Sequence, residues 1–144
     1  MSGSATRDDL VLRIGGESGE GVITVAESVS RIAARMGLCL STYRTFPAEI
    51  KGGACMMQLR VSETPVHHPG DQADMVVAFN EQALRDNLAS LRPGGLLIYE
   101  AAMEGDAPDG RGIRCLPVPF RSLALDAVGN AASKNIVVLG VLAG

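Results

Sequence analysis

The sequence predicts an α/β protein with an open, largely parallel sheet that is covered by helices on both faces. Short apolar runs alternate along the chain with longer runs whose apolar residues recur at helical spacing. Turns rich in glycine, proline and polar residues separate these runs, as in proteins built from repeated strand–helix units. Residues 75–79 are apolar throughout, as expected for a strand buried on both faces. The predicted sheet is Rossmann-like, and ligands of such sheets bind at the carboxyl ends of the strands.

The composition limits the class of protein. The chain has 144 residues, of which 47% are apolar and only 3% aromatic, so one domain with an aliphatic core is expected. The formal net charge is −3, which gives no electrostatic reason to expect nucleic acid or an anionic membrane as a partner. We expect a single domain over residues 10–144. It is expected to continue past the end of this chain, because the sequence stops inside an apolar run.

The first strand–helix unit follows a polar segment. Residues 1–9 are small and polar and predict a flexible leader, and the short apolar run 10–14 predicts a buried strand. Residues 22–36 predict a helix, because apolar residues recur along one side of it. Gly37 follows where a helix C-terminus favours glycine. The members of this apolar stripe are Val22, Val25, Ala26, Val29, Ile32, Ala33 and Met36.

The next part of the chain predicts two strands joined by a loop. Residues 38–46 are rich in threonine, tyrosine and leucine and predict a strand, and residues 47–53 predict a loop. Residues 54–62 alternate between apolar and polar side chains, which indicates a half-buried strand. Residues 63–72 contain two prolines, a glycine and a pair of histidines, so they predict a surface loop. The side chains expected on the buried face of residues 54–62 are Cys55, Met57, Leu59 and Val61.

A second strand–helix–strand unit begins at the apolar run 75–79. Asn80 follows this strand and is a residue type that caps helix N-termini. The helix after it has a buried stripe formed by leucines. Residues 92–95, R-P-G-G, predict a turn, and residues 96–99 predict another central strand. The leucines of the stripe are Leu84, Leu88 and Leu91.

The last third of the chain predicts one edge strand and one short helix. Residues 104–112 are polar and predict a loop. Residues 113–118 alternate but contain Pro117, which fits an edge strand. Apolar residues within 120–128 indicate a short helix. The apolar run 135–144 is rich in β-branched residues, and on that ground alone it predicts a strand.

The three cysteines are far apart in sequence. Cys39, Cys55 and Cys115 show no C-x-x-C spacing, which argues against a disulfide framework, a zinc site or an iron–sulfur cluster held by this chain alone. Buried free thiols in a reducing cytoplasm are therefore expected. The N-terminal segment lacks an apolar signal-peptide region, and no run reaches the length of a membrane span. The sequence predicts a cytoplasmic protein with no metal site and no membrane contact of its own.

Two loops are candidate ligand sites. The first, residues 15–22, reads G-G-E-S-G-E-G-V and joins the first strand to the first helix, where backbone N–H groups and the helix dipole favour an anion. Its spacing matches neither the dinucleotide fingerprint nor the Walker A motif, and Glu17 and Glu20 would repel a phosphate if they faced it. On this loop alone, an ordinary strand-to-helix turn is the favoured interpretation. The second loop, residues 44–53, reads R-T-F-P-A-E-I-K-G-G and combines a proline, three charges and a glycine pair.

Taken together, the motifs G-E-S-G-E-G-V at 16–22 and F-P-A-E-I-K-G-G at 46–53 resemble the gamma-type domain of the 2-oxoacid:ferredoxin oxidoreductases. That family includes the pyruvate, 2-oxoglutarate and ketoisovalerate enzymes. The acidic form of the first loop is most similar to the gamma domain fused ahead of the alpha part in 2-oxoglutarate-type enzymes. Further matches cover nearly the whole chain in order: 69–71 (P-G-D), 73–80 (A-D-M-V-V-A-F-N), 91–95 (L-R-P-G-G) and Asn135.

The resemblance implies a reaction in which a 2-oxoacid, coenzyme A and oxidised ferredoxin give an acyl-CoA, carbon dioxide and reduced ferredoxin. It implies thiamine diphosphate, Mg²⁺ and a [4Fe-4S] cluster on alpha- and beta-type partner subunits or domains, with ferredoxin reached through the complex. This chain lacks grouped cysteines and a G-D-G…N-type metal–diphosphate stretch, so the electron and carbanion chemistry is expected elsewhere. Binding, positioning and closure of the site remain for this domain. The resemblance also implies a helix over residues 135–144.

Coenzyme A is the candidate ligand of this domain, with no catalytic residue expected in the chain itself. Its phosphates call for N–H-rich loops and for cations. Arg44 and Lys51 are candidate cations, and Glu49 is expected to order one of them or to contact a neighbouring subunit. Tyr43 and Phe46 are expected to pack rather than to stack on a ligand. The full candidate set is Gly16, Ser18, Gly19, Glu20, Gly21, Arg44, Glu49, Lys51 and Gly52.

Two other classes of function stay open from the sequence. The domain can be an assembly module that orders the alpha and beta parts and binds no ligand tightly. A free-standing nucleotide-dependent enzyme is a weaker alternative. Co-purification separates these, because an assembly module should travel with larger partners that carry thiamine diphosphate and iron. The sequence does not identify the 2-oxoacid, although the form of the first loop favours 2-oxoglutarate.

Overall fold

The computed structural model of the chain describes residues 9–17, 21–45, 54–68, 70, 72–106, 112–129 and 140. Its strands are β1 Asp9–Glu17, β2 Cys39–Thr45, β3 Ala54–Ser62, β4 Ala73–Ala78, β5 Leu91–Glu100 and β6 Arg114–Val118. Its α-helices are α1 Val22–Arg35, α2 Glu81–Asn87 and α3 Phe120–Val128, and two 3₁₀ helices are η1 Leu88–Ser90 and η2 Ala101–Asp106. β1 begins at Asp9, the last residue of the predicted leader. The predicted element over 135–144 lies, except for Gly140, outside the described residues.

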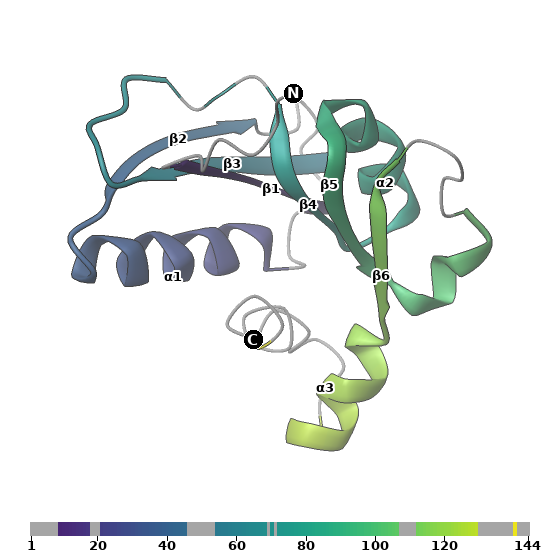
Figure 1. Cartoon of the computed structure of the whole chain (residues 1–144). Helices are drawn as coiled ribbons and strands as arrows, with labels where there is room; N and C mark the ends of the chain where they lie inside the picture. Colours follow the sequence, from purple (N-terminus) through teal and green to yellow (C-terminus); the bar gives the residue numbers. More distant parts are fainter. Residues whose placement is uncertain are drawn as a thin grey trace.

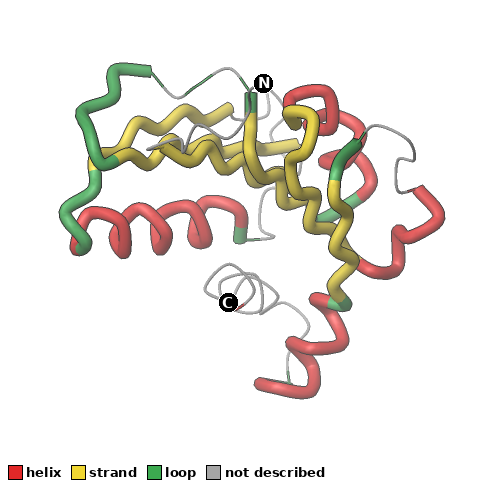
Figure 2. The backbone as a smooth tube through the Cα atoms, viewed as in Figure 1, coloured by secondary structure: helices red, strands yellow, loops and turns green. Residues whose placement is uncertain are grey.

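The six strands form one sheet in the order β2-β3-β1-β4-β5-β6 (Figures 1 and 2). β1, β4, β5 and β6 are parallel neighbours, whereas β3 pairs antiparallel with both β1 and β2. β2 consequently runs in the same direction as β1, and β3 is the one reversed strand of this sheet. The prediction of an open, largely parallel α/β sheet is therefore confirmed.

The reversed direction of β3 follows from the length of its connection. Only residues 46–53 separate the end of β2 from the start of β3. A crossover between parallel neighbours needs a dozen or more residues. A connection as short as this one can therefore join only antiparallel neighbours. Residues 46–53 thus connect the two strands of a hairpin, while α1 carries the chain from β1 to β2 across β3.

Helices cover both faces of the sheet, as predicted. α1 lies along one face beneath β2, β3 and β1, and α3 lies on the same side near the end of β6 (Figure 1). The core on this face is aliphatic apart from two phenylalanines, whose ring centroids are 5.9 Å apart. Its buried members are Leu12, Ile14, Val22, Val25, Ala26, Cys55, Met57, Leu59, Val77, Phe79, Ile98, Val118 and Phe120.

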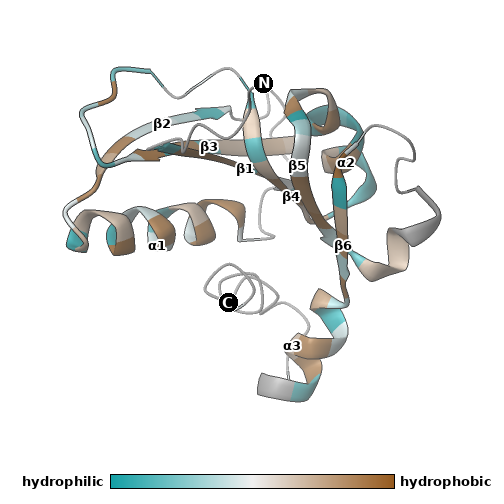
Figure 3. Cartoon of the chain, in the orientation of Figure 1, coloured by the Kyte–Doolittle hydropathy of each residue, from teal (hydrophilic) through white to brown (hydrophobic). Residues whose placement is uncertain are grey.

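The opposite face packs against α2 and η2. Alternate residues of the same strands point to this side, so Val76 and Ala78 of β4 belong here while Val77 belongs to the α1 side. The central strands are accordingly coloured as hydrophobic in Figure 3, whereas the edge strand β2 is paler. The buried members of this second core are Val11, Ala73, Val76, Ala78, Ala83, Leu84, Leu91, Leu97, Tyr99 and Met103.

α1 begins and ends close to the predicted residues. Gly37 has φ = 79°, and the amide N–H groups of Gly37 and Leu38 donate to the carbonyls of Ala34 and Ala33, which is a Schellman motif. The predicted apolar stripe is only partly buried, because Ile32 and Met36 are 55% and 70% exposed. None of the described helices is long and apolar enough to cross a membrane.

The second half of the chain differs from the prediction in two places. Residues 92–95, predicted as a turn, belong to β5, where Gly94 has φ = 80° and the pairing register with β4 shifts. Residues 101–106, partly predicted as loop, form η2. Asn80 caps α2 as predicted, since its side-chain oxygen accepts from the amide of Ala83 at 2.8 Å. β6 is an edge strand that contains Pro117, also as predicted.

A buried carboxylate joins three strands at the amino end of the sheet. Asp74 of β4 is 7% exposed, and its Oδ2 accepts from the backbone N–H of Val11 at 2.8 Å. Its Oδ1 accepts from Nε of Arg92, which belongs to β5. One side chain therefore satisfies a β1 amide and pairs with a β5 cation. Asp74 holds strands together, at the end of the sheet remote from the candidate loops.

Candidate functional site

The structure brings both candidate loops to one edge of the sheet. β1 ends at Glu17 and β2 at Thr45, and these strands point in the same direction. In the antiparallel register Glu17 lies opposite Ala54, and Thr45 lies opposite Met56. The loop after β1 and the loop between β2 and β3 therefore leave the sheet side by side, as expected from the sequence.

Part of the candidate ligand set lies outside the described residues. This applies to Ser18, Gly19 and Glu20 in the first loop, and to Glu49, Lys51 and Gly52 in the second. The described members are Gly16, Gly21 and Arg44. Gly21 has φ = 93° and precedes α1, where its carbonyl accepts from the amide of Val25. A positive φ of this size favours glycine.

The first loop is shorter than predicted, because Gly15 and Gly16 belong to β1. A Cβ on Gly15 would lie 2.4 Å from Nδ2 of Asn87 in α2. A Cβ on Gly16 would lie 2.8 Å from Cγ2 of Val22 and 3.2 Å from the side chain of Phe79. These two glycines let helices on both faces pack closely against β1. This packing is a sufficient reason for glycine at both positions, and no ligand is needed to explain it.

Gly15→Ala is therefore expected to lower the free energy of unfolding by about 1–3 kcal/mol, the usual cost of overpacking a filled core. Thermal and denaturant unfolding measure the effect. The matched test repeats Gly15→Ala in an Asn87→Ala background, where the closest contact is gone and the cost should shrink. An undiminished cost in that background would show that packing against α2 is not the reason for glycine at position 15.

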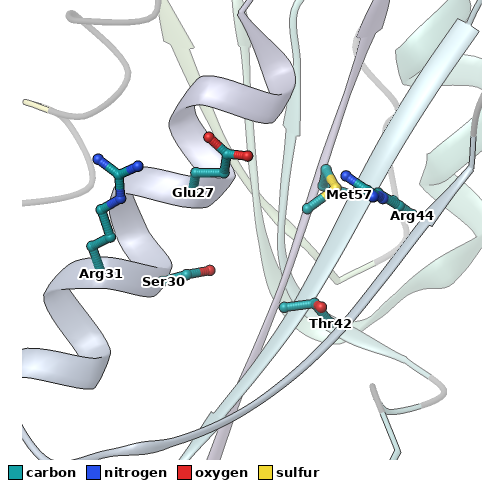
Figure 4. A pocket seen from close by; sticks show the side chains of 6 residues that line it. All are labelled: Glu27, Ser30, Arg31, Thr42, Arg44 and Met57. Atoms are coloured by element: carbon teal, nitrogen blue, oxygen red, sulfur yellow. The ribbon is translucent and has the colours of Figure 1, made fainter.

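A cationic hollow of about 500 Å³ lies between α1 and the β2–β3 hairpin (Figure 4). Arg31 and Ser30 project from α1, and Arg44 and Thr42 project from β2. Arg44 lies opposite Met57 in the strand pairing, one residue before β2 ends at Thr45. The residues that line the hollow are Glu27, Ser30, Arg31, Thr42, Arg44 and Met57.

The charges in this hollow suit an anion with several acceptor oxygens. Glu27 and Arg31 have the i,i+4 spacing that favours a pair, but no ion pair joins them in the described structure. Ser30 uses its hydroxyl hydrogen on the carbonyl of Ala26, at 2.8 Å. The described lining residues include two guanidinium groups and one carboxylate. Guanidinium groups bind phosphate and carboxylate oxygens with a forked geometry.

A second hollow, of about 430 Å³, lies at the carboxyl ends of β1, β4 and β5. Sequence reasoning did not single it out as a site. It is acidic, because Glu17, Glu81 and Glu100 all line it, so it disfavours phosphate. The available signal was positional, since Glu17, Asn80 and Glu100 each follow a predicted strand. Its lining residues are Glu17, Phe79, Asn80, Glu81, Gln82, Glu100 and Met103.

The three thiols lie too far apart for a shared cluster. Cys39 begins β2 opposite the last residue of β3, whereas Cys55 lies near the other end of β3, and Cys115 lies on the far edge strand β6. The expectation that all three are buried is wrong, because Cys115 is exposed and Cys39 only half-buried. Among the described residues no group of three or more histidine, cysteine, aspartate or glutamate side chains is placed to hold a metal ion.

Comparison with known proteins extends over nearly the whole chain. Residues 11–144 match the family described as pyruvate ferredoxin/flavodoxin oxidoreductase. Ketoisovalerate oxidoreductase subunit VorA of Methanothermobacter marburgensis is 28% identical over 132 residues, which are 91% of this chain and 27% of that subunit. The gamma subunit of a keto/oxoacid ferredoxin oxidoreductase from Geobacter sulfurreducens has a TM-score of 0.74 at 25% identity, over 93% of this chain and 74% of that subunit.

A solved structure with ligands is also similar. It is 2-oxoglutarate:ferredoxin oxidoreductase from Magnetococcus marinus with 2-oxoglutarate, coenzyme A and succinyl-CoA bound. The TM-score is 0.85 and the identity 37%, over 95% of this chain but only 24% of that one. The chain thus spans about a quarter of the length of this structure and of the VorA subunit.

Proposed function

Because the chain belongs to the pyruvate ferredoxin/flavodoxin oxidoreductase family, we propose that it serves as the gamma-type domain of a 2-oxoacid:ferredoxin oxidoreductase. In this role it supports the oxidative decarboxylation of a 2-oxoacid to an acyl-CoA with reduction of ferredoxin. The domain holds coenzyme A and closes the site, and alpha- and beta-type partners carry out the carbon and electron chemistry. The substrate favoured by the sequence, 2-oxoglutarate, is also bound in the solved structure from Magnetococcus marinus.

The observation that carries the coenzyme A proposal is the cationic hollow between α1 and the β2–β3 hairpin. Coenzyme A has a diphosphate and a 3′-phosphate, and phosphate groups are held by guanidinium groups and by N–H groups at helix N-termini. Arg31 and Arg44 supply two guanidinium groups beside the hydroxyls of Ser30 and Thr42. The N-cap residue of α1, Gly21, has no side chain that could cap the helix, and the first turn of the helix holds no acidic residue, which favours an anion at this end.

The division of labour rests on the placement of cysteines. An iron–sulfur cluster needs several thiolates around one point, and Cys39, Cys55 and Cys115 lie at separate places on the sheet. A [4Fe-4S] cluster, thiamine diphosphate and Mg²⁺ are accordingly assigned to the partners, where they supply electron transfer and stabilisation of the carbanion. This chain's own contribution is to bind and orient coenzyme A next to that centre.

Arg44→Ala is expected to raise the apparent KM for coenzyme A about tenfold or more in the assembled enzyme. A charge-assisted hydrogen bond contributes roughly 1.5–3 kcal/mol, which corresponds to a change of that size. The KM for the 2-oxoacid should change much less, because decarboxylation takes place on a partner. The effect should weaken as ionic strength rises. Steady-state kinetics with each substrate varied separately measures all three quantities, and the same substitution at the exposed Arg114 of β6 is the control.

A second role, as an assembly module that binds no ligand tightly, is favoured by one observation. Ile32 and Met36, at the end of α1, are more than half exposed although they continue the helix's apolar stripe. Such residues are often covered by another protein. The kinetic test separates the roles. Equal loss with both substrates in Arg44→Ala would indicate an assembly defect, and no change with either would leave Arg44 outside the ligand site.

A further inference from the structure

A second arginine site lies on the face of the sheet opposite the cationic hollow. Arg13 of β1 lines a hollow of about 210 Å³, together with Thr45 of β2, Met56 of β3, and Asp86 and Asn87 of α2. In the strand register Arg13 lies opposite Gln58, which lies opposite Tyr43. This row is on the α2 side, because its neighbours Leu12 and Ile14 point to the α1 side. The hollow is thus separated from Arg31 and Arg44 by the sheet itself.

Arg13 is held in one orientation by a buried glutamine. Its Nε donates to Oε1 of Gln58 at 2.7 Å, and Nε2 of Gln58 donates to the carbonyl of Gly70 at 2.7 Å. Gln58 is only 1% exposed, although the alternation of β3 placed it on the polar face. With Nε occupied, the two terminal nitrogens of Arg13 remain. They have no hydrogen-bond acceptor among the residues that the structure describes.

The charge of Arg13 is poorly solvated and incompletely compensated. Burial lowers the pKa of the Arg13 guanidinium below its ordinary value, while the nearby phenol of Tyr43 acts in the opposite direction. Charged groups removed from water are stabilised by an opposite charge and by hydrogen bonds. No described carboxylate comes within ion-pair distance of Arg13. A ligand that supplies an anionic acceptor would provide what the described part of the protein does not.

Asp86 limits the charge of that ligand. It lines the same hollow as Arg13, and its Oδ1 accepts from Nε2 of Gln82 at 2.7 Å. One cation and one anion thus border the hollow. Arg13 neutralises one negative charge of a bound ligand, whereas a second negative charge beside Asp86 is repelled and finds no further cation among the described lining residues. Two parallel N–H groups of a guanidinium also match the two oxygens of a carboxylate.

We propose that this hollow binds the carboxylate of a small organic acid, with the terminal nitrogens of Arg13 as its donors. The volume accommodates a short-chain monocarboxylic acid but not a nucleotide. The hydroxyl of Thr45 and the side chain of Asn87 border the space in which the rest of the acid lies. The site is distinct from the coenzyme A hollow and does not depend on Arg44, so failure of either proposal leaves the other standing.

The test uses the full chain labelled with ¹⁵N, titrated with propionate and, separately, with inorganic phosphate at matched ionic strength. Propionate, a monocarboxylate, should give saturable shifts of the side-chain signals of Arg13 and Asn87. Arg13→Gln removes the charge and should weaken propionate binding about tenfold or more. Arg114→Gln, at an exposed position of β6, is the matched control and should leave binding unchanged. Asp86→Asn should tighten binding of both anions, and that of phosphate more.

Three results would overturn the proposal. One is equal propionate binding in the wild type and in Arg13→Gln. Another is phosphate binding as tight as propionate binding while Asp86 is present. The third is loss of propionate binding when the partner subunits are added, which would assign the hollow to a contact between subunits. If Arg13→Gln does not fold, two other variants decide the question. Asp86→Asn should tighten binding of the carboxylate, and Arg13→Lys, which keeps the positive charge but loses the two parallel N–H donors, should weaken it.

Discussion

Replacing Asp74 by alanine is expected to lower the free energy of unfolding by about 3 kcal/mol or more. The substitution leaves the buried amide of Val11 without its acceptor and Arg92 without its carboxylate partner. An unsatisfied buried donor costs about 1–3 kcal/mol, and breaking a buried ion pair costs about 3–5 kcal/mol. The lower end of the range for the ion pair applies here, because Arg92 is 39% exposed and water can solvate it. Calorimetry should record a melting temperature lower by roughly 10 °C.

Asp74→Asn refines this expectation, because its side-chain oxygen can still accept from Val11 but carries no charge for Arg92. It should cost less than Asp74→Ala. The exposed Asp126 of α3 provides the control, since Asp126→Asn should change stability by less than about 0.5 kcal/mol. Unfolding curves for Asp74→Ala and Asp126→Asn that superimpose would exclude Asp74 as a structural link between β1, β4 and β5.

Phe120→Ala should be at least as damaging. Phe120 is fully buried at the start of α3 and contacts Phe79, at the end of β4, through a tilted ring pair. Truncation of a buried phenylalanine to alanine costs about 3–5 kcal/mol, because apolar contacts are lost and a cavity remains. Urea unfolding monitored by circular dichroism measures the change in the midpoint. The loss should also loosen α3, whose other fully buried residue is only Ala124 among those described.

Leu123→Ala on the same helix is the matched comparison, because Leu123 is 41% exposed. It should cost a fraction of the Phe120 value. Similar costs for the two substitutions would mean that the isolated chain does not hold α3 as described. Phe120→Leu should recover part of the lost stability, since it refills most of the volume without the aromatic contact.

The strand and helix positions were largely predictable because their signals are local. The stripe from Val22 to Ala33 predicted α1, and the uniformly apolar run around Val76 predicted a central strand. Asn80 and Gly37 marked helix ends through the chemistry of caps. The antiparallel direction of β3 was also implicit, because eight residues cannot form a parallel crossover. Each of these features depends on a few adjacent residues.

The features that escaped prediction depend on distant neighbours. Gln58 is polar yet buried, because Arg13 and Gly70, which are 45 and 12 residues away, satisfy its amide. Gly15 and Gly16 looked like loop glycines, but their size is set by α2 and by Phe79. Ile32 and Met36 follow the helical period and are still exposed. The alternation of apolar residues along a strand and their period along a helix carry no information about such distant contacts.

The same distinction applies to the site. The sequence correctly predicted that the loops after β1 and β2 share an edge, because parallel strands present their carboxyl ends together. It named Arg44 but not its neighbours Ser30, Arg31 and Thr42, which come from two elements joined only by folding. Arg13 lay unnoticed in an apolar run. Its significance arises from α2, more than 70 positions later in the chain.

The reversed strand β3 has a consequence for how this domain can diversify. Since β2 and β3 are adjacent and antiparallel, residues 46–53 begin and end on neighbouring strands that stay paired whatever lies between them. Lengthening such a connection costs little, about 0.6 kcal/mol for each doubling. The register is set by the pairing of β2 with β3, so a change of length between Thr45 and Ala54 does not require it to shift. Evolution can therefore exchange this segment as a cassette, and engineers can graft new recognition sequences into it, without redesigning the rest of the domain.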